Sequence, residues 1–432
     1  MDYQQSRAYV SDADRYAGGA LDLTNIKELM KRLGNPQDQL KYVHVAGTNG
    51  KGSVIAYLYT TLSEAGYRVG RYISPSVYSY REKMEVAGRS VSREQFAGYV
   101  TRVAAAIEEM TSEGLAHPTP FEIETAVAFL FFAEENCDLV ILEVGMGGNL
   151  DATNIIKNTI LAVLVPISMD HQSFLGNTLS EIAEKKAGII KPGCSVVTAG
   201  QQPETMAVIK NVCAQNNADL TEADLREAKA VKEDFAGQIL EYRGENFELS
   251  LAGSYQTENA ALALEALHVL EKKGYPTTVL QRKKGLKDTR WNGRLTIIHR
   301  DPLFIVDGAH NPAAADMLED SVRKYFKGRK MFFIMGVFRD KDYPYIIRKL
   351  CPYAQQIVTV ETPDNPRALP AEELAEAIKP CNPHVQAAGS IEDAVDKVFD
   401  MAGCDDVILS FGSLSFIGQI TAIVKTREEK NS

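Results

Sequence analysis

Apolar runs rich in β-branched residues alternate with longer segments of helical period along most of the chain. Such alternation is typical of βαβ units, in which helices connect the parallel strands of one sheet. The first unit is the clearest: a strand at residues 42–46, a glycine-rich turn at 47–53, a helix at 54–65 and a strand at 69–73. We expect these two strands to run parallel, with a right-handed crossover.

The same alternation continues through the next two hundred or so residues. Between residues 218 and 251 the runs become short and alternate apolar with polar positions, which favours antiparallel strands packed on the edge of the sheet. The other predicted elements are strands at 139–144, 159–166 and 195–199 and helices at 122–135, 179–187 and 258–273.

A basic, polar segment at residues 281–294 contains few large aliphatic side chains and is predicted to join two domains. After it a second alternation begins. We therefore predict an α/β chain with a larger parallel-sheet domain at residues 1–290 and a smaller, Rossmann-like α/β domain at 291–432. The strands expected in the second domain are 303–306, 331–337, 356–360 and 407–411.

Composition narrows the choice of function classes. The 432 residues are 45% hydrophobic and 24% charged, ordinary values for a globular protein. Lys and Arg total 47 against 57 Asp and Glu, a net charge of −10 that disfavours binding to nucleic acid or anionic membranes. Six scattered cysteines without a CxxC pair suggest free thiols, and no signal or membrane-spanning segment is evident, so we expect a cytoplasmic protein.

The segment VAGTNGKGSV lies between a predicted strand and a predicted helix. A glycine-rich turn there can direct backbone N–H groups at a phosphate, so we interpret it as a P-loop and the N-terminal domain as a P-loop ATPase domain. It differs from the usual G-x-x-x-x-G-K-[ST] spelling, because the loop is shorter and a glycine separates the lysine from the serine. A plain strand-to-helix connection is the alternative. The predicted phosphate-binding residues are Gly47, Thr48, Asn49, Gly50, Lys51, Gly52 and Ser53.

Three side chains follow strands of the predicted sheet and could hold Mg²⁺. Glu143 ends one strand, Ser74 follows another, and His171 comes after a third. Ligands bind at the carboxyl ends of such strands, and oxygen donors suit a hard cation beside nucleotide phosphates. Each residue also has an interpretation without a metal. Glu143 can be a solvated carboxylate in a turn, Ser74 a hydroxyl that starts a proline turn, and His171 a structural histidine. Lys186, on a predicted helix, reads from its spacing alone as solvated charge.

In the second domain the segment LFIVDGAHNP is a predicted strand followed by a turn. Asp307 can accept hydrogen bonds from ribose hydroxyls, and His310 can stack on or bond to a base. Arg294, in the predicted junction, can contact phosphate from the far side. A simple turn and a solvent-facing arginine are the alternatives.

Together these motifs resemble the folylpolyglutamate synthase and dihydrofolate synthase family of the Mur ligase superfamily. The resemblance covers most of the chain from about residue 42. The motifs, in family order, are HVAGTNGKGSV, EVGMGGNLDATN, SMDHQSFLG, EKKAGIIKPG, GSYQTENAALAL, WNGR, VDGAHNP, MGVFRDKD and SFGSLSFIG.

The resemblance implies roles for individual residues. Ser74, Glu143 and His171 match magnesium ligands, and two Mg²⁺ ions are implied. Asn259, Arg294 and Asp307, with Gly50 and Lys51, match ATP-binding positions, and His310 matches a histidine near the nucleotide. Lys186 matches a lysine that is often carbamylated and helps to place the second metal. Lys51, Lys186 and His171 are thus the implied catalytic residues.

The implied reaction is ATP-dependent addition of L-glutamate to the γ-carboxylate of folate through an acyl phosphate. Whether the protein also makes dihydrofolate from dihydropteroate is open. The sequence departs from the family at Ser76 and Lys83, where histidine and arginine are usual near the pterin site, and at Asn149 and Tyr255. We expect a monomer whose partners are small molecules.

Two other functions stay open at this stage. A Mur-type ligase for a cell-wall nucleotide shares the chemistry, but the P-loop begins at Gly47, which disfavours an extra N-terminal domain for a uridine nucleotide. A nucleotide-dependent switch without ligase activity would leave Ser74, Glu143 and His171 unexplained.

Overall fold

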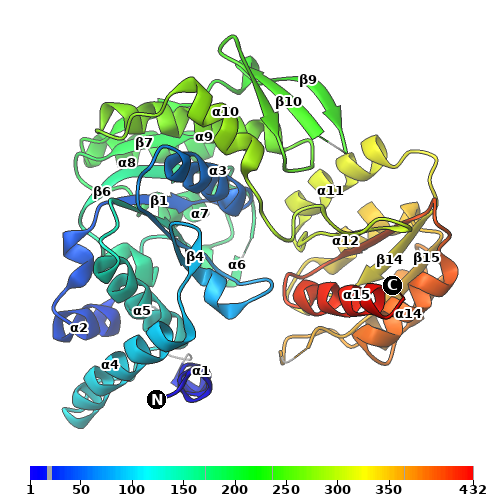
Figure 1. Cartoon of the computed structure of the whole chain (residues 1–432), viewed down its shortest axis with the longest axis horizontal. Coiled ribbons are helices and arrows are strands. Elements are labelled where there is room, and N and C mark those ends of the chain that lie inside the picture. Colours follow the sequence, from blue (N-terminus) through cyan, green and yellow to red (C-terminus); the bar gives the residue numbers. More distant parts are fainter. Residues whose placement is uncertain (17–21, 171, 236, 364, 432) are drawn as a thin grey trace.

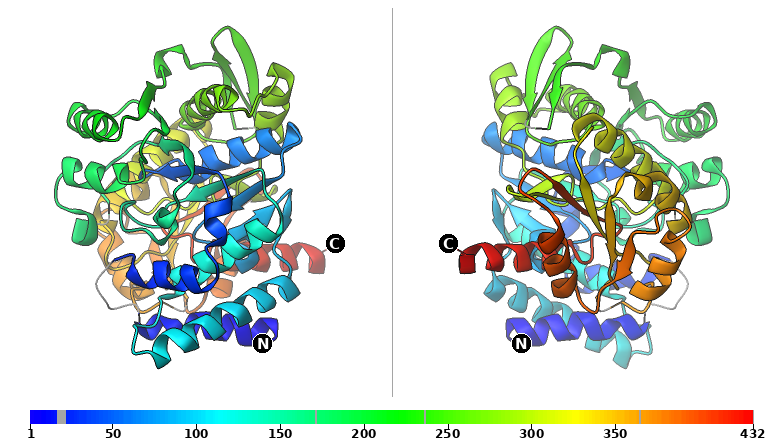
Figure 2. Two further views of the ribbon diagram at one scale, coloured as in Figure 1. Left: turned by 90° about the vertical axis from the view of Figure 1, so that its left-hand side faces the viewer. Right: turned by 90° about the vertical axis from the view of Figure 1, so that its right-hand side faces the viewer.

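The computed structural model describes residues 1–16, 22–170, 172–235, 237–363 and 365–431. Two α/β domains lie side by side, as Figure 1 shows. The N-terminal helices lie at one end of the molecule and a small antiparallel sheet lies at the opposite end (Figure 2).

An eight-stranded, mostly parallel sheet forms the centre of the N-terminal domain, in the order β4-β3-β2-β5-β1-β6-β7-β8. The antiparallel pairs among the described strands of this sheet lie at one edge, where β3 pairs with β2 and β4 pairs with β3. The predicted parallel orientation of the first two strands is confirmed, although β5 lies between them. The strands are β1 (Tyr42–Ala46), β2 (Val69–Tyr72), β3 (Met84–Val86), β4 (Arg89–Ser90), β5 (Leu139–Glu143), β6 (Thr159–Leu164), β7 (Ser195–Thr198) and β8 (Asp219–Glu222).

Helices cover both faces of this sheet, because successive side chains of a buried strand point to opposite sides. In β1, Val43 and Val45 pack towards α3 and α9, whereas Tyr42 and Ala46 pack towards the helices of the other face. The helices are α1 (Tyr3–Asp12), α2 (Thr24–Arg32), α3 (Lys51–Glu64), α4 (Arg93–Ser112), α5 (Pro120–Glu134), α6 (Gln172–Leu175), α7 (Leu179–Ala187), α8 (Pro203–Gln215), α9 (Gln256–Lys272) and α10 (Val279–Asp288).

The segment predicted as antiparallel strands on the edge of the sheet divides in two. Its first strand, β8, joins the large sheet in parallel with β7. The rest forms a separate sheet in the order β11-β10-β9, made of β9 (Lys229–Asp234), β10 (Gly237–Tyr242) and β11 (Glu245–Leu249). This sheet packs its apolar side chains against α9 and α10, so the prediction of antiparallel pairing is confirmed but the predicted location is wrong.

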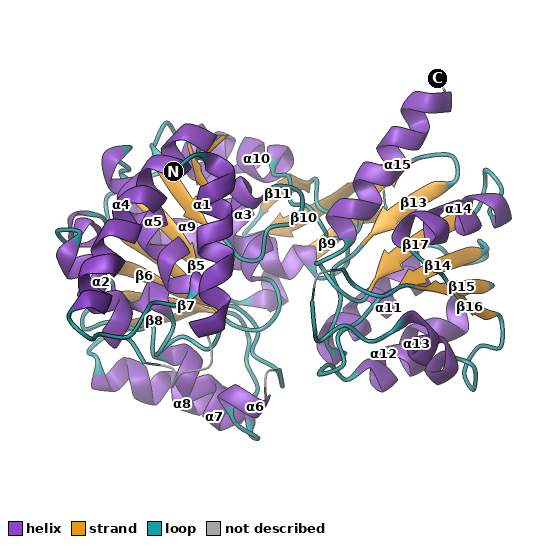
Figure 3. Ribbon diagram, turned by 90° about the horizontal axis from the view of Figure 1, so that it is seen from below, coloured by secondary structure: helices purple, strands orange, loops and turns teal. Residues whose placement is uncertain are grey.

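The C-terminal domain has a six-stranded sheet in the order β12-β13-β17-β14-β15-β16, in which only β12 is antiparallel. Helices α11 to α13 cover one face, and α14 and α15 cover the other (Figure 3). Its strands are β12 (Thr296–His299), β13 (Leu303–Val306), β14 (Met331–Met335), β15 (Gln356–Thr359), β16 (Val385–Ala387) and β17 (Val407–Phe411). Its helices are α11 (Pro312–Tyr325), α12 (Tyr343–Leu350), α13 (Ala371–Ile378), α14 (Ile391–Met401) and α15 (Ile417–Asn431).

The main departures from the sequence-based elements concern helices. Helix α3 begins at Lys51, three residues before the predicted start, because the P-loop glycine Gly50 is its N-cap. Helix α10 occupies much of the predicted junction, and the connection between domains follows it at residues 289–295. In the described part of the chain, no helix has the length and apolar character needed to span a membrane.

Candidate active site

The predicted P-loop lies between the end of β1 and the start of α3, at the carboxyl edge of the large sheet. Gly47 and Gly50 have φ values of +138° and +100°, which favour glycine. A Cβ atom at Gly47 would lie 2.7 Å from the carbonyl oxygen of Val165, so the neighbouring strand end also requires glycine there. Ser53 is buried in the first turn of α3 and accepts a hydrogen bond from Gln256 Nε2 at 3.2 Å.

Two of the predicted metal ligands lie beside the P-loop. The backbone N–H of Ser74 donates to Glu143 Oε2 at 3.2 Å, and Lys51 Nζ lies 4.0 Å from Glu143 Oε1. Burial raises the pKa of Glu143, whereas the Lys51 ammonium opposes that shift. A desolvated carboxylate suits a hard cation such as Mg²⁺, and the backbone contact brings the serine residue close to it, so these two oxygen donors fit the expected ion.

The third predicted metal ligand cannot be added to this pair. His171 lies outside the described residues. Among the described residues, no group of three or more His, Cys, Asp and Glu side chains is arranged to hold a metal ion.

Lys186 is buried, contrary to the solvated charge that its spacing suggested. Its Nζ donates to the carbonyl oxygen of Gly47 at 2.8 Å, which brings the end of α7 to the P-loop. Burial, with the Lys51 charge nearby, lowers its pKa from 10.5 to about 7. A neutral amine is the form that reacts with carbon dioxide, so the site suits the carbamylation that the resemblance implies.

Seven of the predicted nucleotide-binding residues, drawn from both domains, line one cleft, whereas Gly47, Thr48, Lys51 and Gly52 are not part of its lining. It contains Asn49, Gly50 and Ser53 from the P-loop region, Asn259 from α9, and Arg294, Asp307 and His310 from the C-terminal domain. Asp307 is held by the backbone N–H groups of Leu295 and Ala309, at 2.9 and 2.8 Å. Its burial raises the pKa of the carboxyl, and Arg294 opposes the shift.

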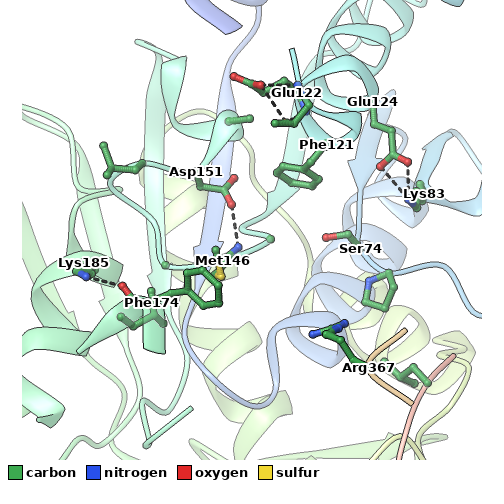
Figure 4. A pocket seen from close by; sticks show the side chains of 18 of the residues that line it. Ser74, Lys83, Phe121, Glu122, Glu124, Met146, Asp151, Phe174, Lys185 and Arg367 are labelled. Carbon is green, nitrogen blue, oxygen red and sulfur yellow. Dashed lines mark hydrogen bonds and ion pairs between the residues drawn. The ribbon is translucent and has the colours of Figure 1, made fainter. Parts of the chain in front are cut away.

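A second, larger cavity of about 670 Å³ spans the two domains, a volume typical of a small-molecule site. Figure 4 shows Phe121 and Asp151 in the cavity wall that the N-terminal domain forms. Arg367 reaches the cavity from the C-terminal domain. Lys341 and Ser413 also line the C-terminal end. His310 lines both this cavity and the nucleotide cleft, so the two spaces meet beside it.

Sequence reasoning missed most of this cavity. Asp151 and Lys341 belong to the quoted motifs EVGMGGNLDATN and MGVFRDKD but were given no role, and Phe121 and Arg367 lie outside every motif. One usable signal was the capping box of α5, in which Thr119 and Glu122 bond reciprocally and fix the first helical turn beside Phe121.

The departures from the family pattern are distributed unevenly. Lys83 and Asn149 line the large cavity, and Tyr255 lines the nucleotide cleft. Lys83 Nζ donates to both oxygens of the buried Glu124 at 2.8 Å. Ser76 belongs to neither lining among the described residues.

Family models agree with this architecture. The Mur ligase middle domain matches residues 45–267, and the Mur ligase glutamate ligase domain matches residues 293–414. These matches define the class of protein as a Mur ligase.

Individual relatives narrow the class. The chain is 34% identical to the dihydrofolate synthase/folylpolyglutamate synthase of Bacillus subtilis, over 98% of this chain and 99% of the relative. A Mycobacterium tuberculosis folylpolyglutamate synthase complexed with ADP and AMPPCP aligns with a TM-score of 0.87 and 31% identity, over 98% and 99% of the two chains. A structure described as an FPGS-AMPPCP-folate complex aligns with a TM-score of 0.84 and 28% identity, over 99% and 100%. The chain belongs to the folylpolyglutamate synthase and dihydrofolate synthase family.

Proposed function

We propose that this protein uses ATP to add L-glutamate to the γ-carboxylate of a reduced folate, and that it also joins glutamate to dihydropteroate. The observation that carries the proposal is that two spaces share His310 in their linings: a P-loop cleft for nucleotide and a cavity of about 670 Å³ lined by residues of both domains. The names of the relatives support the same chemistry.

The N-terminal end of the cavity suits the pterin ring. Phe121 offers an aromatic face, and the buried carboxylate of Asp151 lines the same end of the cavity (Figure 4). The amino and ring N–H groups of a pterin lie on one edge and can donate to a carboxylate. With the ring at this end, the carboxylate that reacts points towards the P-loop and His310.

The C-terminal end of the cavity suits the incoming glutamate. Its two carboxylates need cationic or N–H partners, and Arg367 and Lys341 both line this end together with Ser413. The amine of glutamate is then directed at the reacting carboxylate, which lies between the two ends.

The nucleotide cleft holds ATP with its phosphates on the P-loop. Backbone N–H groups of the loop from Gly47 to Ser53 and the N-terminus of α3 bind phosphate, and Lys51 at the start of α3 and Arg294 from the C-terminal side of the cleft supply positive charge. Asn259 and Asp307 line the same cleft and bind the rest of the nucleotide. Ser74 and Glu143 would hold Mg²⁺, which, when bound, neutralises charge on the phosphates. The metal-binding role of His171 stays a prediction from the sequence.

The reaction proceeds in two transfers. A folate carboxylate oxygen attacks the γ-phosphorus of ATP, ADP leaves, and an acyl phosphate forms. The nitrogen of glutamate then attacks the acyl carbon, loses a proton, and phosphate leaves from the tetrahedral intermediate. Lys51 and Arg294 stabilise negative charge in both steps. Contacts between the domains exclude water, which would otherwise hydrolyse the acyl phosphate.

The net charge of −10 supports small-molecule substrates rather than nucleic acid or a membrane. A cytoplasmic monomer, two Mg²⁺ ions and a domain boundary at residues 290–291 complete the proposal.

A substrate panel tests the function. We expect phosphate release from ATP only when L-glutamate and either tetrahydrofolate or dihydropteroate are both present. Release with tetrahydrofolate but not with dihydropteroate would show that the protein does not join glutamate to dihydropteroate. Release with a UDP-muramoyl substrate, or release indifferent to every pterin, would contradict the proposal and favour a cell-wall ligase or a nucleotide switch.

A further inference from the structure

His44 is a buried histidine that the reaction does not use. It lies in β1, three residues before the P-loop glycine Gly47, and its side chain is fully buried. Its Nε2 lies 2.8 Å from Thr153 Oγ1, and the same hydroxyl lies 2.5 Å from Asp151 Oδ1. A chain of two hydrogen bonds therefore connects the central strand of the sheet to the carboxylate that faces the large cavity.

The direction of these bonds can be assigned from the groups involved. Asp151 already accepts from the backbone N–H of Met146 at Oδ2, at 2.9 Å, and from that of Thr153 at Oδ1, at 3.0 Å. Both carboxylate oxygens are thus acceptors, so the Thr153 hydroxyl donates its hydrogen to Asp151. The hydroxyl oxygen then has only lone pairs for His44, and Nε2 must carry the imidazole hydrogen.

Two further observations agree with this tautomer. Burial lowers the pKa of His44 to about 3, so the ring is neutral at physiological pH. Its Nδ1 has no hydrogen-bond partner in the described part of the chain, as expected for a nitrogen without hydrogen in an apolar core. The bond to Thr153 is therefore the polar interaction that this side chain makes.

The other donors to Asp151 come from its own loop. Met146 and Thr153 lie between β5 and the end of the short 3₁₀ helix Ala152–Ile155, so they move with the carboxylate. His44 belongs instead to the centre of the sheet, where β1 pairs with β5 and β6. It therefore connects the loop to a strand that is paired on both sides.

We propose that His44 is a positioning residue for the pterin end of the cavity: through Thr153 it fixes the Asp151 carboxylate at the orientation that receives the N–H edge of the pterin. This inference rests on the proposed function. Because β1 continues into the P-loop, this one strand sets the position of the Asp151 carboxylate and also that of the P-loop.

The test uses the full-length protein and three variants: His44→Leu, His44→Gln and Thr153→Val. A glutamine amide can place an N–H group near the position of the histidine Nε2, whereas leucine cannot. Binding of tetrahydrofolate, dihydropteroate and AMPPCP is measured by calorimetry, with thermal unfolding as a check on folding.

We expect His44→Leu to weaken pterin binding about fivefold, which corresponds to the loss of about 1 kcal/mol from one correctly placed hydrogen bond, while AMPPCP binding stays within about twofold. His44→Gln should recover most of the loss. Thr153→Val should resemble His44→Leu, and the double variant should be no weaker than either single variant, because all three break the same chain.

Other results overturn the inference. Pterin affinity in His44→Leu equal to that of the unaltered protein would do so, as would equal losses in His44→Gln and His44→Leu or parallel losses of pterin and AMPPCP binding. If His44→Leu does not fold, the nearly isosteric Thr153→Val decides in its place. Failure of the unaltered protein to bind any pterin would instead refute the proposed function.

Discussion

The two ends of the large cavity are built in different ways. At the pterin end, Asp151 is held by Met146 and Thr153, and both Asp151 and Phe121 belong to the N-terminal domain. Beside the other end, which Lys341 lines, and beside the nucleotide cleft, which Asn49 lines, contacts cross between the domains. Lys341 Nζ lies 3.2 Å from Asp170 Oδ1, and Asn49 Nδ2 donates to Asn311 Oδ1 at 3.2 Å.

The loop that carries Ser74 also reaches the C-terminal domain. Val77 packs against the apolar cluster that α14 and α15 form with the C-terminal sheet. A Cβ atom at Gly418 would lie 2.1 Å from the carbonyl oxygen of Val77. The pterin end is therefore formed by one domain alone, whereas the reaction site, between the pterin end and the glutamate end, depends on how the two domains meet. Pterin binding and ligation should be separable by substitution.

The largest expected effect comes from a substitution in the proposed metal site beside the P-loop. Glu143→Ala should lower kcat about 1000-fold, because it removes an oxygen ligand and leaves phosphate charge without its counterion. The measurement is ATP-dependent phosphate release across a Mg²⁺ titration, with tetrahydrofolate affinity recorded in parallel. Pterin binding should be nearly unchanged.

A matched control for that variant is Glu134→Ala. Glu134 forms an exposed ion pair with Arg102, and such pairs contribute at most about 1 kcal/mol to stability. It should have normal turnover. Full activity in Glu143→Ala would refute the proposed metal site.

Breaking the interface between the domains should have the next largest effect. Lys341→Met leaves the nearly buried Asp170 without this partner, so we expect kcat/KM for ATP and glutamate to fall about 50-fold. Tetrahydrofolate affinity should stay within about twofold. Lys349→Met is the control, because Lys349 pairs with Asp316 and Glu319 inside the C-terminal domain. A parallel loss of folate binding in Lys341→Met would remove the distinction between the two ends.

Phe121→Ala changes the pterin end of the cavity. Loss of an aromatic face should weaken tetrahydrofolate and dihydropteroate about tenfold, since aromatic stacking contributes about 1 kcal/mol or more. Calorimetry with AMPPCP provides the internal control and should give an unchanged affinity. Equal weakening of both ligands would show that the pterin end is not independent.

The smallest and most specific effect concerns Lys186. A carbamate forms when a neutral amine attacks carbon dioxide and loses a proton, and the Lys186 amine, with a pKa of about 7, becomes neutral as the pH rises through that value. We expect a carbon-13 carbamate signal from labelled bicarbonate to grow between about pH 6 and 8 and to disappear as the pH falls.

The neighbouring lysine supplies the control for this signal. It should persist in Lys185→Gln and vanish in Lys186→Gln. A signal that survives in Lys186→Gln would belong to another amine, and its absence from the unaltered protein at pH 8 would contradict carbamylation.

Local patterns predicted much of the fold and part of the site. Strand β1 and the P-loop were predictable because hydrophobic runs, glycines and a helix start are short-range signals. Phe121, Asp151, Lys341 and Arg367 were not, because they come together only when distant elements pack. Lys186 was misread for the same reason: its helix spacing cannot show that the P-loop buries it.

The most direct test of the central claim is mass spectrometry of the product formed from tetrahydrofolate, L-glutamate, ATP and Mg²⁺. The proposal predicts a folate lengthened by one glutamyl residue for each phosphate released. Phosphate release without a lengthened folate, or a product that forms without ATP, would contradict it.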